Sequence, residues 1–121
     1  MMDTIFIREL AVETVIGIYD WEREIKQTVY FDLEMSCDIA RAAASDSVDD
    51  TLNYKAVSQA LIALVEKSEF QLVETLAERV AQMILNDFEV SWLRLTLNKR
   101  GALSAAKDVG VQIERGQRDV Q

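Results

Sequence analysis

Lys99 is the residue whose type and position most clearly suggest chemistry. It follows Leu93, Leu95 and Leu97 in the apolar phase of an expected strand and comes just before Gly101. A lysine that points toward the covered side of a sheet is partly desolvated, which disfavours the ammonium form, lowers the pKa and makes a usable base. The alternative is a side chain that extends past the end of the sheet into water, and the strand pattern alone favours that alternative.

Three further side chains are candidates for binding or proton transfer. Glu74 comes near the start of an expected helix, where a carboxylate is favoured and could bind the N–H edge of a heterocycle with both oxygens. Glu22 lies in an expected loop beside Tyr19 and Trp21. Tyr54 opens another expected helix, where its ring could stack on a planar ligand. The ordinary alternatives are a charged residue at a helix start for Glu74 and a ring that caps the core for Tyr54.

The residue inventory excludes several kinds of site. The 121 residues include no histidine and one cysteine, which excludes His-based nucleophile systems, His-ligated metals, thiolate zinc clusters and internal disulfides. Asp46, Asp49 and Asp50 lack the glycine and terminal glutamate of an EF-hand loop and indicate a solvated loop. We expect acids and bases only from Asp, Glu, Lys, Tyr or Cys37, with neither a metal nor a cofactor.

The overall composition is that of a globular chain of one domain. Half of the residues are hydrophobic and 28% are charged, and the formal net charge of -8 disfavours binding to nucleic acid. No run of about 18 apolar residues occurs, so we expect no membrane span. The N-terminal residues MMDTIFIREL do not resemble a signal peptide, and together with the lone cysteine they predict a cytoplasmic protein.

Hydrophobic periodicity divides the chain into strands and helices. Alternation with period two predicts a strand over 28–38, with Cys37 on its apolar face as a buried, unreactive thiol. The first strand, over 4–16, is expected to be irregular around Ala11. The other expected elements are a connecting loop over 19–24, a short helical turn with an acidic loop over 39–52, helices over 54–67 and 71–87, strands over 91–99 and 108–115, and a frayed tail over 117–121.

These elements follow the order ββααββ. Runs of strands and helices, rather than alternating βα units, predict an α+β fold in which two helices cover one face of an antiparallel four-stranded sheet within a single domain over 1–116. The other face would carry Tyr30, Trp92, Arg94 and Thr96, a mixed surface that could line an interface or a lumen. This open face and the open sheet edges indicate that subunits join through strands or sheet faces.

Several short motifs occur in order along the chain. They are Asp3-Thr4-Ile5-Phe6, Gly17 with Glu22, Gln27 with Phe31-Asp32-Leu33, Thr51-Leu52-Asn53-Tyr54, the run from Leu72 to Glu78, Lys99 with Gly101-Ala102, and the run from Gly110 to Arg115. With this set the chain resembles the bacterial dihydroneopterin aldolases, folate-pathway enzymes of the tunnelling fold, over essentially its whole length up to about residue 116.

The resemblance implies a pterin-binding site. Glu74 would anchor the pterin through its 2-amino and ring N–H groups, and Tyr54 would pack on its rings. Backbone groups of Leu52 and Val73 would complete the pocket, with Thr51 beside them. In this family the pocket lies between two subunits, so Glu74 of one copy would work with Tyr54 of a neighbour, in rings of four that stack into an octamer.

The resemblance also implies the reaction. The family cleaves 7,8-dihydroneopterin by a retro-aldol step into 6-hydroxymethyl-7,8-dihydropterin and glycolaldehyde, with the pterin imine as electron sink and without a metal or Schiff base. Lys99, Glu22 and Tyr54 would handle the protons. One departure is Arg100, which stands where many members of the family have a proline directly after the lysine.

Two alternatives share the same residues. A 2′-epimerase acting on dihydroneopterin or its triphosphate needs the same cleavage, followed by re-addition of glycolaldehyde to the other face. The scattered basic residues and the net charge of -8 give little support to a triphosphate substrate. The second alternative is a non-catalytic pterin-binding assembly, which would retain Glu74 and Tyr54 but have no use for Lys99.

Overall fold

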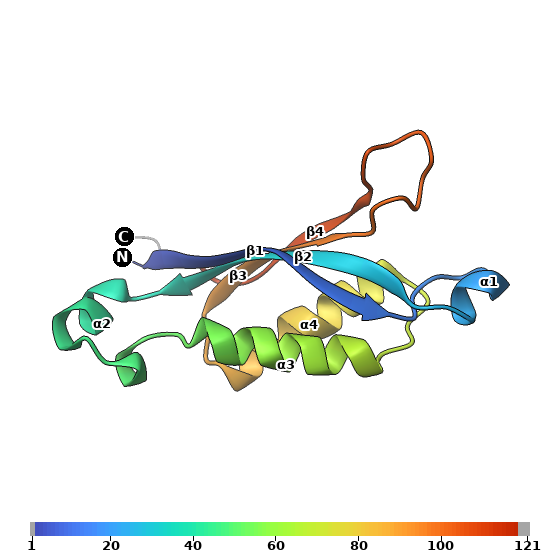
Figure 1. Ribbon diagram of the computed structural model, residues 1–121. Helices are drawn as coiled ribbons and strands as arrows, with labels where there is room; N and C mark the ends of the chain where they lie inside the picture. Colours follow the sequence, from blue (N-terminus) through green and yellow to red (C-terminus); the bar gives the residue numbers. More distant parts are fainter. Residues whose placement is uncertain (1, 119–121) are drawn as a thin grey trace.

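The computed structural model describes residues 2–118, in which four antiparallel strands form one sheet in the order β1-β2-β3-β4 (Figure 1). The predicted α+β architecture is confirmed, because the two long helices follow the first two strands and precede the last two. The strands are β1 (Asp3–Thr14), β2 (Gln27–Cys37), β3 (Trp92–Asn98) and β4 (Gly110–Gly116). The helices are α1 (Asp20–Arg23), α2 (Ile39–Ser45), the 3-10 turn η1 (Val48–Asp50), α3 (Tyr54–Lys67) and α4 (Val73–Asp87).

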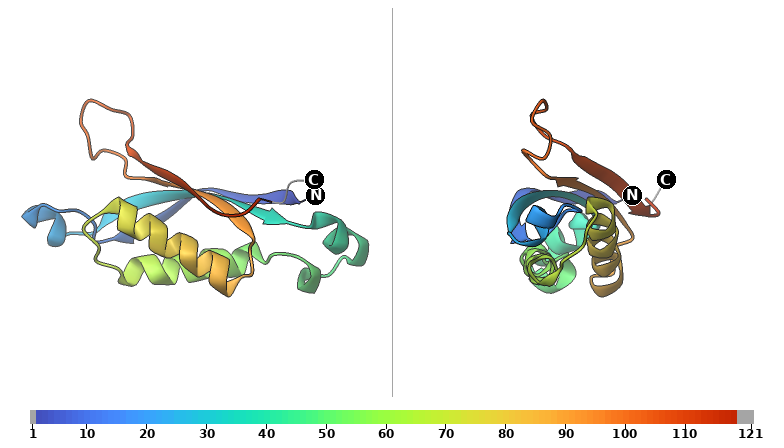
Figure 2. Two further views of the ribbon diagram at one scale, coloured as in Figure 1. Left: turned by 180° about the vertical axis from the view of Figure 1, so that it is seen from behind. Right: turned by 90° about the vertical axis from the view of Figure 1, so that its right-hand side faces the viewer.

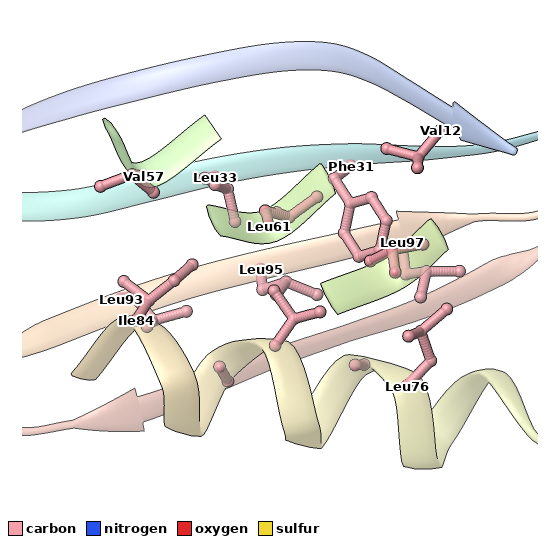
Figure 3. Packing of buried hydrophobic residues seen from close by; sticks show 14 of the residues in the cluster. Val12, Phe31, Leu33, Val57, Leu61, Leu76, Ile84, Leu93, Leu95 and Leu97 are labelled. Carbon is pink, nitrogen blue, oxygen red and sulfur yellow. The ribbon is translucent and has the colours of Figure 1, made fainter. Parts of the chain in front are cut away.

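The core lies between the sheet and the pair α3 and α4, as Figure 3 shows. Phe31 and Leu33 of β2 alternate with solvent-facing residues and are fully buried, as is Leu95 of β3. Leu61 of α3 and Ile84 of α4 meet them from the helix side. Residues at period two on strands and at helical spacing on helices therefore share one apolar layer, which holds the ends of these elements in fixed positions.

The first strand is irregular directly before Ala11, close to the predicted position. Its register against β2 shifts between Ile7 and Leu10, so the bulge precedes Ala11. Glu9 has a left-handed backbone with φ of 54°, and its N–H donates to Asp32 Oδ1 at 2.6 Å. The carboxylate of the neighbouring strand thus stabilises an extra residue that the ladder cannot pair.

The face of the sheet opposite the helices is open, as Figure 2 shows from two directions. Arg94 pairs there with Glu34 of β2 (3.3 Å) and Glu114 of β4 (3.6 Å). Trp92, expected on this face, is only 3% exposed. The guanidinium groups of Arg118 and Arg94 lie over its ring, at 4.2 and 5.8 Å from the ring centre.

Three local features differ from, or add to, the expected elements. The segment 19–24, expected as a loop, contains the single-turn helix α1. The helix expected over 71–87 begins at Val73. Of the expected tail, Gln117 donates from its N–H to the Ser91 carbonyl at 2.9 Å, and 119–121 lie outside the described residues.

Cys37 is free and buried, as predicted. No helix within 2–118 has the length and hydropathy that a membrane crossing needs.

Candidate active site

A pocket of about 480 Å³ opens at the end of the sheet that carries α1. Three segments form its walls: the turn that leads into α1, the start of α4, and the two ends of the long β3–β4 connection. That connection projects from the sheet on the side away from α3 and α4 (Figure 1). The lining includes Glu22, Gln27, Val73, Glu74 and Lys99, so four of the predicted site residues and one further motif residue meet in one cavity.

Lys99 and Glu22 form a buried ion pair in this pocket. Lys99 Nζ donates to Glu22 Oε2 at 2.5 Å, and the two side chains are only 12% and 6% exposed. The alternative in which Lys99 extends into water is therefore wrong. The Lys99 N–H donates to the Val109 carbonyl (2.8 Å), which extends the β3–β4 ladder by one step and keeps the side chain in phase with buried Leu97.

Further hydrogen bonds hold the Glu22 carboxylate in its ionised form. Burial opposes the charge, but the bond from Lys99, a bond from Gln27 Nε2 (3.2 Å), a bond from the Tyr19 N–H (3.3 Å) and the Lys99 charge outweigh it. The pKa of Glu22 consequently lies below its ordinary value. Gln27 also donates to the Ile16 carbonyl at 2.9 Å, which ties the carboxylate to the end of β1. Sequence reasoning assigned no role to Gln27, although it belongs to the motif set.

Gly17 makes room for this carboxylate. Its φ is +135°, and a Cβ at this position would lie 2.2 Å from both Cδ and Oε1 of Glu22. Only glycine adopts this backbone without strain and leaves the space empty. The pairing of Gly17 with Glu22 in one motif is thus explained by direct contact.

Glu74 and Val73 approach the same pocket from the first turn of α4. The N-cap residue, Leu72, offers no side-chain hydrogen bond to the helix, so the first main-chain N–H groups of α4 have no capping partner on that residue. Glu74 is exposed, unlike Glu22. An exposed carboxylate in the first turn of a helix, beside main-chain N–H groups, can bind a planar ligand that has both donors and acceptors along one edge.

The other predicted binding residues lie elsewhere in the chain. Thr51 and Leu52 line a separate hollow of about 250 Å³ beside α2 and η1, and Tyr54 begins α3 with 62% of its surface exposed. Helix α3 has 14 residues and is therefore about 20 Å long, which is roughly the separation between its first residue and the connection to α4. Figure 1 shows α2 and α1 at opposite ends of the molecule. A single chain does not bring Tyr54 together with Lys99.

Arg100, the residue that departs from the family pattern, contacts the bulge of β1. Its guanidinium pairs with Glu9 and lies over the Tyr30 ring at 3.9 Å. The ion pair with Glu9 raises the pKa of Arg100 further above its ordinary value. These contacts tether the residue after Lys99 to two neighbouring strands.

Within residues 2–118, no cluster of three or more Asp, Glu, Cys or His side chains could hold a metal ion.

The chain is similar to proteins of known class along nearly its full length. The family model FolB, described as dihydroneopterin aldolase, matches residues 5–114. A dihydroneopterin aldolase from Haemophilus influenzae is 46% identical over 115 residues, which cover 95% of this chain and 98% of the relative.

Two solved structures share the fold closely. A Vibrio cholerae structure described as dihydroneopterin aldolase (FolB) is 50% identical, with a TM-score of 0.94, and the match covers 97% of this chain and 99% of that one. The Escherichia coli dihydroneopterin aldolase, solved in complex with neopterin, is 47% identical, with a TM-score of 0.93 and coverage of 95% and 100%.

Proposed function

Since the chain belongs to the dihydroneopterin aldolase family, we propose that the pocket around Lys99 and Glu22 performs the retro-aldol cleavage of 7,8-dihydroneopterin. The products are 6-hydroxymethyl-7,8-dihydropterin and glycolaldehyde, and the pathway is folate biosynthesis. The observation that carries the proposal is the buried ion pair of Lys99 with Glu22, 2.5 Å apart, in the pocket that Glu74 also lines. A proton-handling pair and a carboxylate for a heterocycle are the two parts that this chemistry needs.

The pterin is held by the start of α4. Glu74 accepts hydrogen bonds from the 2-amino group and the adjacent ring N–H, and the main chain at Val73 adds a polar contact. This assignment is supported by the position of both residues on the pocket wall and by the uncapped first turn of α4. The Escherichia coli relative has been solved with neopterin bound, which is consistent with a pterin as the ligand.

A neighbouring copy supplies Thr51, Leu52 and Tyr54. Within one chain these residues lie at the end of the molecule opposite the Lys99 pocket, and Tyr54 exposes its ring. A head-to-tail contact that places one copy's α3 start against the next copy's pocket uses different surfaces on the two partners and repeats around a ring. Exposed Ile18 and Trp21 at the pocket rim provide the apolar surface for it. We assign rings of four subunits, stacked in pairs as an octamer.

The reaction moves one proton and one electron pair within the substrate. Lys99, acting through a water molecule, is the base that takes the proton of the 2′-hydroxyl. The C1′–C2′ bond then breaks, the new C2′ carbonyl leaves as glycolaldehyde, and the bond's electrons enter the pterin imine. Tyr54 of the neighbour, or water, protonates the enamine-like product at C1′. Glu22 holds Lys99 in place throughout, and no cofactor is required because the pterin accepts the electrons.

The test is an anaerobic incubation with 7,8-dihydroneopterin, followed by chromatography of the products. The parent protein is expected to release hydroxymethyldihydropterin and glycolaldehyde in equal amounts, and Lys99→Ala to be about 100- to 10,000-fold slower while it still binds neopterin. An isomerised substrate without glycolaldehyde would indicate the 2′-epimerase instead. Unchanged substrate with the parent protein would leave a non-catalytic pterin-binding assembly.

We place the reaction in the cytoplasm, as expected for a chain whose single cysteine is free.

A further inference from the structure

Arg23 is the last residue of α1, and it binds three main-chain oxygens. Its Nη1 donates to the carbonyl of Gly17 at 2.9 Å and to the carbonyl of Phe70 at 3.1 Å. Its Nη2 donates to the carbonyl of Glu69 at 2.5 Å. One guanidinium therefore joins two segments that lie 46 to 47 residues apart in the sequence.

These two segments form different walls of the pocket. The turn from Gly17 to the end of α1 carries Glu22, which holds Lys99. The other segment, 68–72, connects α3 to α4 and leads directly into Val73 and Glu74. The distance between the proton-handling pair and the proposed pterin anchor depends on how these two segments sit against each other.

The local structure gives α1 little stability of its own. A helix of four residues lacks the length to form without tertiary contacts. A guanidinium is suited to supply such contacts, because its planar fork of N–H groups reaches several acceptors in fixed directions. A lysine ammonium at the same position is a single point charge that does not reproduce this planar geometry.

We propose that Arg23 is a positioning residue that fixes the wall carrying Glu22, the partner of Lys99, against the wall with Glu74. The inference rests on the proposed function, since it concerns the alignment of the Lys99–Glu22 pair with a substrate anchored by Glu74. Loss of the guanidinium leaves both the anchor and the proton-handling groups in the protein but misaligns them. A misplacement of about 1 Å costs catalysis about 100-fold. The effect therefore falls on kcat more than on pterin binding.

The experiment compares Arg23→Ala and Arg23→Lys with the parent and with Arg79→Ala. Arg79 of α4 places its guanidinium over the Phe70 ring at 5.3 Å, so this control removes a cation that contacts the same connection without removing a bond to its carbonyls. We expect both Arg23 variants to lower kcat about 10- to 100-fold with neopterin affinity within about threefold, and Arg79→Ala to match the parent. Added guanidinium is expected to restore several-fold activity to Arg23→Ala, because it can occupy the vacated fork site.

Hydrogen–deuterium exchange gives a readout that does not depend on activity. Peptides spanning 16–24 and 68–74 are both expected to exchange faster in Arg23→Lys and Arg23→Ala, and not in Arg79→Ala. Parent-like kcat in Arg23→Lys would overturn the proposal, as would an unchanged kcat per neopterin-binding site in Arg23→Ala. If Arg23→Ala does not fold, Arg23→Lys carries the test. A parent protein that cleaves no dihydroneopterin would instead refute the proposed function, and the exchange data would still decide the role of Arg23.

Discussion

The two ends of the sheet carry site residues of opposite character. At the α1 end, Lys99 and Glu22 are buried, paired with each other and surrounded by further hydrogen bonds from the same chain. At the other end, Tyr54 has 62% of its surface exposed and offers its ring to the outside. One group is organised within a single chain, and the other is a free surface.

This difference separates two requirements of catalysis. Groups that move protons must be held within a fraction of an ångström, and for the proposed pair of Lys99 and Glu22 a network inside one chain can achieve this without a partner. A ring that packs on a flat ligand tolerates small displacements, so a neighbouring subunit can supply it. The division predicts which variants complement each other when different chains are mixed in one assembly.

The largest expected effect comes from mixing Lys99→Ala with Tyr54→Ala. Each variant alone is expected to be slowed at least 10-fold, because every site lacks one of the two groups. Hybrid assemblies are obtained by co-expressing the two variants with different affinity tags and purifying through both tags. With random mixing, about a quarter of their sites combine an intact Lys99 from one chain with an intact Tyr54 from another. Their activity is expected to approach a quarter of the parent value.

A second hybrid is the matched control for that experiment. Lys99→Ala mixed with Glu22→Gln damages the same end of both chains, so no site recovers an intact pair. Activity is expected to stay at the level of the variants alone. Recovery in this control, or none in the first hybrid, would contradict a site divided between the α1 end of one chain and the α3 start of another.

Glu74→Gln tests the binding side of the α1 end. Replacing the carboxylate by an amide removes a charge-assisted acceptor, so neopterin is expected to bind about 10- to 100-fold more weakly. Fluorescence titration with neopterin measures the change, with Lys99→Ala alongside as the variant that keeps its affinity. Equal losses in both variants would show that the two roles are not separate.

Gly17→Ala tests whether the α1 end depends on close packing. The new Cβ would lie 2.2 Å from the Glu22 carboxylate, and the φ of +135° is strained for alanine, so the free energy of unfolding is expected to fall by about 1–3 kcal/mol. Denaturant unfolding measures the loss. Gly101→Ala is the control, because its φ of +80° adds strain but no atom lies within 4 Å of its Cβ. A smaller loss for Gly17→Ala than for Gly101→Ala would refute the packing explanation.

The smallest expected effect concerns acid stability. The pKa of Glu22 is lowered in the folded protein, so its contribution to stability is present above the ordinary value of 4.5 and is lost as the pH falls below it. Glu22→Gln is expected to reduce the acid-induced drop in unfolding free energy, because the amide has no charge to lose. Part of the drop is expected to remain in this variant, because the pKa of Glu78 is also lowered, chiefly by its hydrogen bond from Arg115. An acid dependence identical to that of the parent would contradict the stabilised carboxylate.

The strongly periodic parts of the fold could be predicted from the sequence, and the contacts between distant segments could not. The strand over 28–38 and the helix over 54–67 were found because their apolar residues recur at fixed intervals. Helix α1 was missed, because its four residues are held by contacts with distant segments rather than by a periodic pattern. The burial of Lys99 depends on Glu22, which lies 77 residues away, so the strand pattern alone favoured the wrong alternative. The structure places Lys99 and Glu22 together, but their catalytic roles stay predictions, as do the roles of Glu74, Tyr54, Leu52, Val73 and Thr51.

Under the proposed function, the separation of Tyr54 from Lys99 along a single chain would make the activity depend on protein concentration. If a complete pocket needs two copies, dilution that dissociates the assembly removes sites faster than it unfolds chains. By mass action, a pterin that bridges two copies favours association, and its own apparent affinity rises with the amount of enzyme present. In that case, specific activity is a property of the assembly at its working concentration rather than a constant of the chain.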